Sequence, residues 1–274
     1  SDDSTRFYGN ISARGGAAAG DGGFVEVSGK RWLDYKGLAD TRAPNGTTGT
    51  LLLDPTDITI VTGAGDGTTT SLPGFDGDPF YLPAASPSAQ IEWFTIKENL
   101  VLNNAIITTT SLESGTGGGN ITIVDASPDL ASVNRLDLRA NNNILVNGAI
   151  TNTSAGHVLM YAGYDDNFVT PYVNAGTGSI TLNAPVSTAG DIHMIAGSNI
   201  SQGALGNITA ANLLAVSESG SVNLATSTAA NMVGEISGEG YGQFSFRNQG
   251  NLTIGSHSEG VRVFNGISAF GYGS

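Results

Sequence analysis

The chain repeats a short apolar triplet at intervals of 22 residues, at 136–138 (Leu-Asp-Leu), 158–160 (Val-Leu-Met), 180–182 (Ile-Thr-Leu), 222–224 (Val-Asn-Leu) and 244–246 (Phe-Ser-Phe). One interval is doubled, between the third and the fourth triplet. A fixed period of about 20 to 50 residues is typical of proteins that stack repeated units. The spacing therefore predicts a solenoid before any functional motif is considered.

Shorter spacings between apolar segments divide this period. Many neighbouring segments begin about eight residues apart, as at 136 and 144, at 214 and 222, and at 192, 200 and 208. About three such steps fill one period, which predicts an all-β parallel β-helix with three short strands per turn. An antiparallel sandwich also has many short strands, but hairpin strands seldom repeat at one fixed register. At the skipped position, Ile200-Ser201-Gln202 ends on a polar residue, which predicts a bulged or weaker turn.

Two segments depart from the strand pattern. Residues 62–90 are rich in Gly, Thr, Asp and Pro, and proline removes donors from a sheet, so a loop excursion is expected there. Residues 91–102 predict one short helix with apolar residues near one face. The expected organisation is a single β-helix domain over 1–274, with the first coils at 1–61 and the remaining coils at 103–274. Candidate recognition residues within the loop are Phe75, Asp76, Asp78, Phe80 and Tyr81.

The charge of the chain narrows its partners. There are 24 Asp and Glu against 11 Lys and Arg, for a net charge of −13. Nucleic-acid binding needs clustered basic residues, so we expect none. No apolar run approaches the roughly 20 residues of a membrane helix, so we expect no membrane insertion. Residues 1–4 lack the basic start and apolar stretch of a secretory signal, so the chain is expected to be a mature or excised piece.

Several blocks in the amino-terminal part resemble a known family. They are GNISARGG at 9–16, GDGGFVEVSGK at 20–30, LLLDPTDITI at 51–60, IKENL at 96–100 and GGNIT at 118–122. In this order they resemble the filamentous-haemagglutinin family of large exoproteins, and the resemblance covers residues 9–123. It implies a right-handed parallel β-helix, secreted by the two-partner route through an outer-membrane barrel.

The resemblance also implies a function and partners. Members of the family mostly serve as adhesins, and some are toxin-delivery stalks or haem scavengers. The expected location is extracellular or on the bacterial surface, with the outer-membrane transporter and a host-surface glycan or protein as partners. The family's secretion-domain motifs, Asn-Pro-Asn-Leu and Asn-Pro-Asn-Gly-Ile, are absent, so an internal section of the rod is expected. The chain has no cysteine, which fits a protein that crosses the periplasm unfolded.

Residues able to carry catalysis do not converge in the sequence. The histidines His157, His193 and His257 fall at unrelated phases of the repeat, so we interpret them as surface or satisfied residues. Without cysteine there are no disulfides, zinc-thiolate sites or iron–sulfur clusters. No Gly-x-Ser-x-Gly elbow occurs. We therefore expect no enzymatic activity, no cofactor and no bound metal.

A carbohydrate-active β-helix enzyme is the rival hypothesis. It requires two carboxylates roughly 5–9.5 Å apart. However, Asp54 and Asp57 lie in Leu-Asp-Pro-Thr-Asp, where aspartate is typical of a turn. Acid pairs could also bind calcium, but neither an EF-hand loop nor a Gly-Gly-x-Gly-x-Asp repeat is present. The candidate acids are Asp54, Asp57, Asp76, Asp78, Asp165 and Asp166.

Two further hypotheses concern modification and assembly. Seven Asn-x-Ser/Thr acceptors for N-linked sugar occur, although an asparagine corner that enters an Ile-Thr strand produces the same tripeptide. They begin at Asn10, Asn45, Asn120, Asn152, Asn199, Asn207 and Asn251. An uncapped solenoid end leaves strand edges open, so end-to-end self-association into a filament, or a haem-source-binding role, is an alternative to adhesion.

Overall fold

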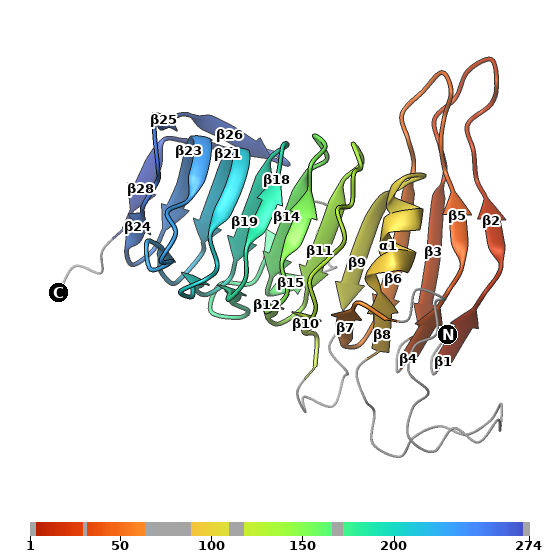
Figure 1. The fold of residues 1–274 in the computed structure, drawn as a ribbon, viewed down its shortest axis with the longest axis horizontal. Coiled ribbons are helices and arrows are strands. Elements are labelled where there is room, and N and C mark those ends of the chain that lie inside the picture. Colours follow the sequence, from red (N-terminus) through yellow and green to blue (C-terminus); the bar gives the residue numbers. More distant parts are fainter. Residues whose placement is uncertain (1–3, 30–31, 64–88, 110–117, 166–171, 271–274) are drawn as a thin grey trace.

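The computed structural model of the chain describes residues 4–29, 32–63, 89–109, 118–165 and 172–270. These residues form a parallel β-helix, in which short strands stack side by side along a rod (Figure 1). Successive turns of the chain pass through three sheet faces. The predicted all-β parallel β-helix with three short strands per turn is therefore confirmed.

The first face is a continuous parallel sheet. Nine of the described strands follow one another along it, and two of them, β21 and β23, begin on the neighbouring third face and continue through the corner. The strands are β3 (Phe24–Gly29), β6 (Thr50–Pro55), β9 (Asn104–Thr109), β11 (Leu136–Ala140), β14 (Val158–Ala162), β19 (Ile192–Ala196), β21 (Ile208–Ser217), β23 (Met232–Gly240) and β28 (Ile267–Ala269).

The second face is a separate parallel sheet of eight described strands. They are, in spatial order, β8 (Ala89–Glu92), β7 (Ile58–Val61), β10 (Ile121–Ile123), β12 (Ile144–Val146), β17 (Ile180–Leu182), β20 (Ile200–Gln202), β22 (Val222–Leu224) and β24 (Phe244–Phe246).

The remaining strands complete the third face, the amino-terminal coils and two hairpins. The third face contains β13 (Ile150–Asn152), β18 (Val186–Thr188) and the first halves of β21 and β23, and β25 (Thr253–Ile254) pairs with β23. In the amino-terminal coils, β1 (Ser4–Phe7) pairs with β4 (Trp32–Tyr35) and β2 (Asn10–Ser12) with β5 (Leu38–Asp40). The antiparallel hairpins are β15 (Tyr164–Asp165) with β16 (Tyr172–Val173), and β26 (Ser256–Glu259) with β27 (Arg262–Asn265).

Inward side chains of equivalent strands stack on one another in the core. On the second face, Ile144 pairs with Ile121 on one side and with Ile180 on the other, and all three are 0% exposed. Burying each such side chain contributes about 1.5–3 kcal/mol. At the two ends of the rod, Phe7 and Phe244 are only partly buried against the core. End-to-end association stays a prediction.

The strand register corrects how the five triplets align. The triplets at 136 and 158 lie on the first face, whereas those at 180, 222 and 244 lie on the second. Val158 pairs with Ile192, and Ile180 pairs with Ile144. The hairpin β15–β16 is inserted after β14 and delays the next second-face strand. The spacing of 22 residues between positions 158 and 180 is therefore accidental.

The predicted weak turn at Ile200 is wrong. Strand β20 pairs in continuous register with β17 and β22, and Ile200 is fully buried. Its polar third residue, Gln202, is also buried. The Gln202 amide donates to the carbonyl of Gly206 at 2.7 Å and to Oδ1 of Asn231 at 2.6 Å. A buried polar side chain is tolerated when its hydrogen bonds are made, so the turn remains regular.

The predicted helix is present but shorter than 91–102. It is α1 (Trp93–Leu100), because Ile91 and Glu92 belong to β8, which also shortens the loop predicted over 62–90. Among the described residues no helix has the length and apolar character to cross a membrane. Outside the described residues lie the candidate recognition positions Phe75, Asp76, Asp78, Phe80 and Tyr81.

Two asparagines let this helix replace a strand beside β5. The Asn99 amide donates to the carbonyl of Gly37 at 3.0 Å, and its Oδ1 accepts from the backbone N–H of Ala39 at 2.9 Å. One helical turn later, Asn103 donates to the carbonyl of Ala39 at 2.8 Å and accepts from the N–H of Thr41 at 2.9 Å. The two side chains thus satisfy the backbone groups that a neighbouring strand would otherwise bind.

Candidate functional site

A polar ladder runs along the corner that precedes the second face. The residue immediately before each of seven second-face strands is polar, and these residues are Asp57, Asn120, Asn143, Ser179, Asn199, Ser221 and Gln243. Because equivalent positions of successive turns stack about 4.8 Å apart, their side chains can bond from one turn to the next.

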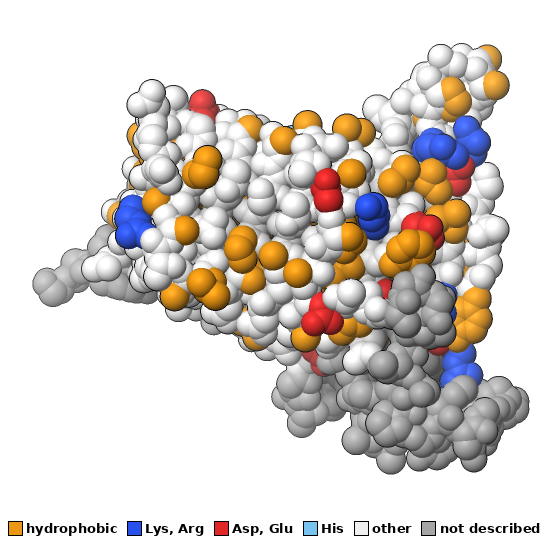
Figure 2. All heavy atoms as spheres, in the orientation of Figure 1, with side chains coloured by type: hydrophobic (Ala, Val, Ile, Leu, Met, Phe, Trp, Pro, Cys, Tyr) orange, Lys and Arg blue, Asp and Glu red, His pale blue; other side chains and the backbone are white. Residues whose placement is uncertain are grey.

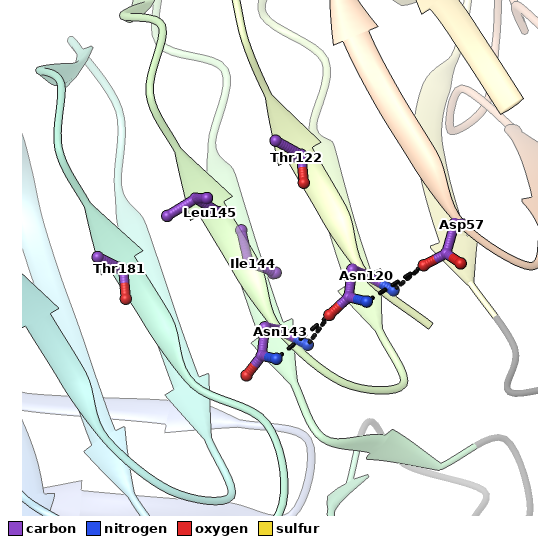
Figure 3. Close-up of a pocket in the computed structure, with 7 residues that line it drawn as sticks. All are labelled: Asp57, Asn120, Thr122, Asn143, Ile144, Leu145 and Thr181. Atoms are coloured by element: carbon purple, nitrogen blue, oxygen red, sulfur yellow. Dashed lines mark hydrogen bonds between the residues drawn. The ribbon is translucent and has the colours of Figure 1, made fainter. Parts of the chain in front are cut away.

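Hydrogen bonds connect the first rungs of this ladder. The backbone N–H and the side-chain amide of Asn120 both donate to Oδ1 of Asp57, at 2.8 and 3.3 Å. Asn143 donates in the same way to Oδ1 of Asn120, at 3.2 Å for each bond (Figure 3). Oδ1 of Asn143 accepts from the backbone N–H of Ser179 at 2.9 Å. These bonds fix the orientation of each side chain.

A groove of about 470 Å³ lies over this part of the ladder. The middle residues of β10, β12 and β17 alternate outward from the buried core and form its wall, with the ladder along one side (Figure 3). Its lining consists of Asp57, Asn120, Thr122, Asn143, Ile144, Leu145 and Thr181. The lining therefore presents amides, hydroxyls, one carboxylate and one exposed aliphatic side chain, and it contains no basic residue.

The other candidate acids are engaged elsewhere. Oδ2 of Asp165 accepts from the amide of Asn174 at 3.0 Å within the β15–β16 segment. Asp54 lies in β6 of the first face. Among the described residues, no three histidine, aspartate or glutamate side chains are placed to hold a metal ion. The positions Asp76, Asp78 and Asp166 lie outside the described residues.

The structure brings together two histidines that are far apart in the sequence. The rings of His193 and His257 lie 6.2 Å apart, edge to face. Nδ1 of His257 is 2.8 Å from Oγ of Ser237 and 4.0 Å from the carboxylate of Glu235. Both groups meet the same ring nitrogen, and Ser237 is 0% exposed, so they do not form a catalytic triad. His157 is nearly half exposed.

These histidines lie under the carboxyl-terminal hairpin, which folds back over the first face. Hairpin β26–β27 crosses the direction of the first-face strands (Figure 1). Glu259, near its turn, accepts from the hydroxyl of Tyr161 at 2.8 Å and lies 2.6 Å from Nδ1 of His193. The hairpin covers a second apolar cluster: Leu159, Tyr161, Tyr164, Val173, Ile195, Leu214, Val216 and Phe264.

Burial and hydrogen bonds shift the pKa values under the hairpin. Burial raises the pKa of Asp137, against the opposing effect of the Arg139 guanidinium, which donates to it at 2.6 Å. Burial also raises the pKa of Tyr161. For Glu259 burial acts in the raising direction, but the hydrogen bonds from His193 and Tyr161 outweigh it, so its pKa is lowered. The carboxylate of Glu259 is therefore the form that holds the hairpin.

Neutralising Glu259 is expected to loosen the hairpin while the rod stays folded. A lowered carboxyl pKa contributes stability that is present above the unfolded value of about 4.3 and is lost as the pH falls through the folded value. The raised pKa of Asp137 has the opposite sign, because its protonation adds stability as the pH falls. The variant Glu259→Gln removes the first effect alone. At pH 7 it should cost the hairpin about 1–2 kcal/mol.

Hydrogen exchange followed by mass spectrometry measures this effect. At pH 7, residues 256–265 should exchange roughly 5- to 30-fold faster in Glu259→Gln than in the wild type. The control is Glu26→Gln, at an exposed position on β3, which should exchange as the wild type does. Equal hairpin exchange in Glu259→Gln and the wild type would show that Glu259 does not hold this segment.

The seven glycosylation acceptors occupy different environments. Asn10, Asn45, Asn199 and Asn251 are exposed, and Asn120 and Asn207 are half-buried. Asn152 is 2% exposed, and its amide donates to the carbonyls of Ser132 and Gly156 at 2.9 and 3.1 Å. A sugar on the Asn152 nitrogen would break both bonds. The exposed four are therefore the positions at which the fold leaves room for a sugar.

Comparisons with known proteins give no identification. No protein-family model matches the chain. No curated protein sequence matches it either. Its function is therefore inferred from the fold and from the chemistry of its surfaces.

Proposed function

We propose that this chain is a structural and adhesive rod segment of a secreted bacterial surface exoprotein of the filamentous-haemagglutinin type. In this proposal it attaches the cell to host cells, to surfaces or to other bacteria, and it does so by binding a glycan. The single observation that carries the proposal is the hydroxyl- and amide-lined groove on an otherwise regular polar face. The resemblance of residues 9–123 to that family supports the extracellular location.

The groove has the chemistry that suits sugar hydroxyls. Asparagine offers donors and an acceptor, threonine offers both through one hydroxyl, and the carboxylate of Asp57 accepts. Leu145 adds an apolar surface for the C–H face of a sugar ring. A concave site with a few oriented polar groups is the usual form of a small-molecule site. The hydrogen bonds of the ladder hold Asn120 and Asn143 in place before binding, which reduces the entropy lost on binding.

The charge of the protein selects among glycans. The net charge of −13 and the absence of a basic residue in the lining disfavour sulfated or carboxylated chains. On the face of the rod shown in Figure 2, most of the described surface is uncharged. A glycan without acidic groups is therefore the ligand that the groove fits. One carboxylate in the lining does not supply the two acids that glycoside hydrolysis uses.

Removing two hydroxyls from the groove wall tests this function. In Thr122→Ala/Thr181→Ala, the loss of two neutral hydrogen bonds of about 0.5–1.5 kcal/mol each should weaken binding about 5- to 100-fold. The matched control is Asn223→Ala/Ser245→Ala, at outward positions of the same face outside the groove lining. Binding to immobilised uncharged and sulfated oligosaccharides of equal length is measured.

The outcomes of this experiment differ clearly. The wild type and the control should bind the uncharged oligosaccharides better than the sulfated ones, and the double variant should bind both poorly. Equal binding by the wild type and Thr122→Ala/Thr181→Ala would contradict the proposed site. A preference of the wild type for sulfated chains would contradict the proposed ligand class.

A further inference from the structure

Asp57 is the one charged residue in the groove lining. It stands at the end of the described hydrogen-bonded run formed with Asn120 and Asn143, immediately before β7. Both bonds from Asn120 reach the same carboxylate oxygen, Oδ1. The side chain is half-buried at the groove. Asp57 therefore combines a fixed position with a negative charge in a site that otherwise holds only neutral groups.

Donor and acceptor capacity indicates what this carboxylate can bind. A carboxylate has two oxygens with about four acceptor positions, and the bonds from Asn120 engage only Oδ1. Each ladder amide also has two hydrogens, one of which serves the preceding rung. A ligand with an ammonium group next to hydroxyls can donate to the carboxylate while its hydroxyls bind Asn120 and Thr122. A charge-assisted bond of this kind is about twice as strong as a neutral one.

The surrounding charge reinforces the same choice. The lining contains no lysine, arginine or histidine, so no protein cation in the lining competes for Asp57. The net charge of −13 attracts cationic ligands and increases their local concentration at low salt. The ladder fixes the carboxylate, so little side-chain entropy is lost when a cation binds.

We propose that the groove selects an amine-bearing polysaccharide, a hexosamine polymer with free amino groups, and that Asp57 pairs with the ammonium group. This inference rests on the proposed glycan-binding function and adds the ligand class and the residue that recognises it. Thr122 and Thr181 bind hydroxyls that every hexose polymer has. Asp57 distinguishes the free amine from a hydroxyl or an acetylated amine at the same position.

The variant Asp57→Asn isolates the charge. Asparagine keeps an Oδ1 acceptor for the bonds from Asn120, so the ladder and the fold are retained, and thermal unfolding should match the wild type within a few degrees. Binding is measured to three oligosaccharides of equal length, namely glucosamine, N-acetylglucosamine and glucose oligomers, at low and at physiological salt. The wild type should bind the glucosamine oligomer about tenfold more tightly than the glucose oligomer, with the difference reduced by salt.

Each result has a defined meaning. In Asp57→Asn the preference for the glucosamine oligomer should disappear, while binding of the glucose oligomer stays within twofold of the wild type. An unchanged preference in Asp57→Asn, or a wild type that binds the three oligomers equally, overturns this inference and leaves the glycan groove intact. Failure of the folded wild type to bind any of the three overturns the inference and the proposed function together. Loss of glucose-oligomer binding in Thr122→Ala/Thr181→Ala but not in Asp57→Asn supports both.

Discussion

Replacing Asn103 by alanine should destabilise the chain by about 3–5 kcal/mol. The substitution removes the amide that binds the backbone of Ala39 and Thr41. Thr41 and Asn103 are both 0% exposed, so the backbone groups released have no water to replace the amide. An unsatisfied buried group costs about 1–3 kcal/mol, and at least two are created. Urea unfolding measures the loss.

Two further variants sharpen this test. Glu98→Ala, on the exposed side of the same helix, should change stability by less than about 0.5 kcal/mol. Asn103→Asp keeps the acceptor for Thr41 but places a carboxylate oxygen against the carbonyl of Ala39, so it should be about as harmful as alanine. A cost below about 1 kcal/mol for Asn103→Ala would contradict the view that side-chain amides replace a strand beside β5.

Replacing Gly178 by alanine should cost about 4 kcal/mol or more. Gly178 lies where the β15–β16 insertion rejoins the coil, with a φ of +68°. A Cβ there would stand 2.0 Å from the backbone nitrogen of Gly163 and 2.4 Å from the carbonyl carbon of Ala162. Backbone at both contacts cannot move without breaking the ladder, so steric overlap adds to the strain of a positive φ, which alone costs about 1–2 kcal/mol.

Gly176 provides the matched control for Gly178. It also has a positive φ, +87°, but a Cβ at this position would meet nothing within 4 Å. Gly176→Ala should therefore show the backbone strain alone, about 1–2 kcal/mol. Thermal and urea unfolding of the two variants give the difference. Similar costs at both positions would show that the close approach to Gly163 is relieved at little expense.

The sequence predicts the architecture but not the strand register. The period of about 22 residues and the steps of eight indicate three strands per turn, and the structure has that arrangement. The alignment of 158 with 180 is wrong because the hairpin inserted between Ala162 and Ser179 adds nearly the length needed to restore the period by accident. An insertion of this length cannot be distinguished from the repeat by spacing alone.

The candidate sites were harder to predict than the fold. Asn120 is recognisable as an asparagine before an Ile-Thr strand, but its bonds to Asp57 join residues 63 positions apart. The hairpin contacts are longer still, with 98 residues between Tyr161 and Glu259. One signal was present in the sequence. Residues 158–162 are all buried, and such a continuous apolar strand is typical of a sheet covered on both sides.

The most direct test of the glycan groove is nuclear magnetic resonance of the chain with labelled asparagine side chains. On titration with an unlabelled glucosamine oligomer, the side-chain amide signals of Asn120 and Asn143 should shift, because these groups line the groove. The signals of Asn99 and Asn152, which are 2% exposed, should not move. Saturable shifts confined to the two ladder amides are the predicted result. Unchanged Asn120 and Asn143 signals at saturating oligomer would contradict the account.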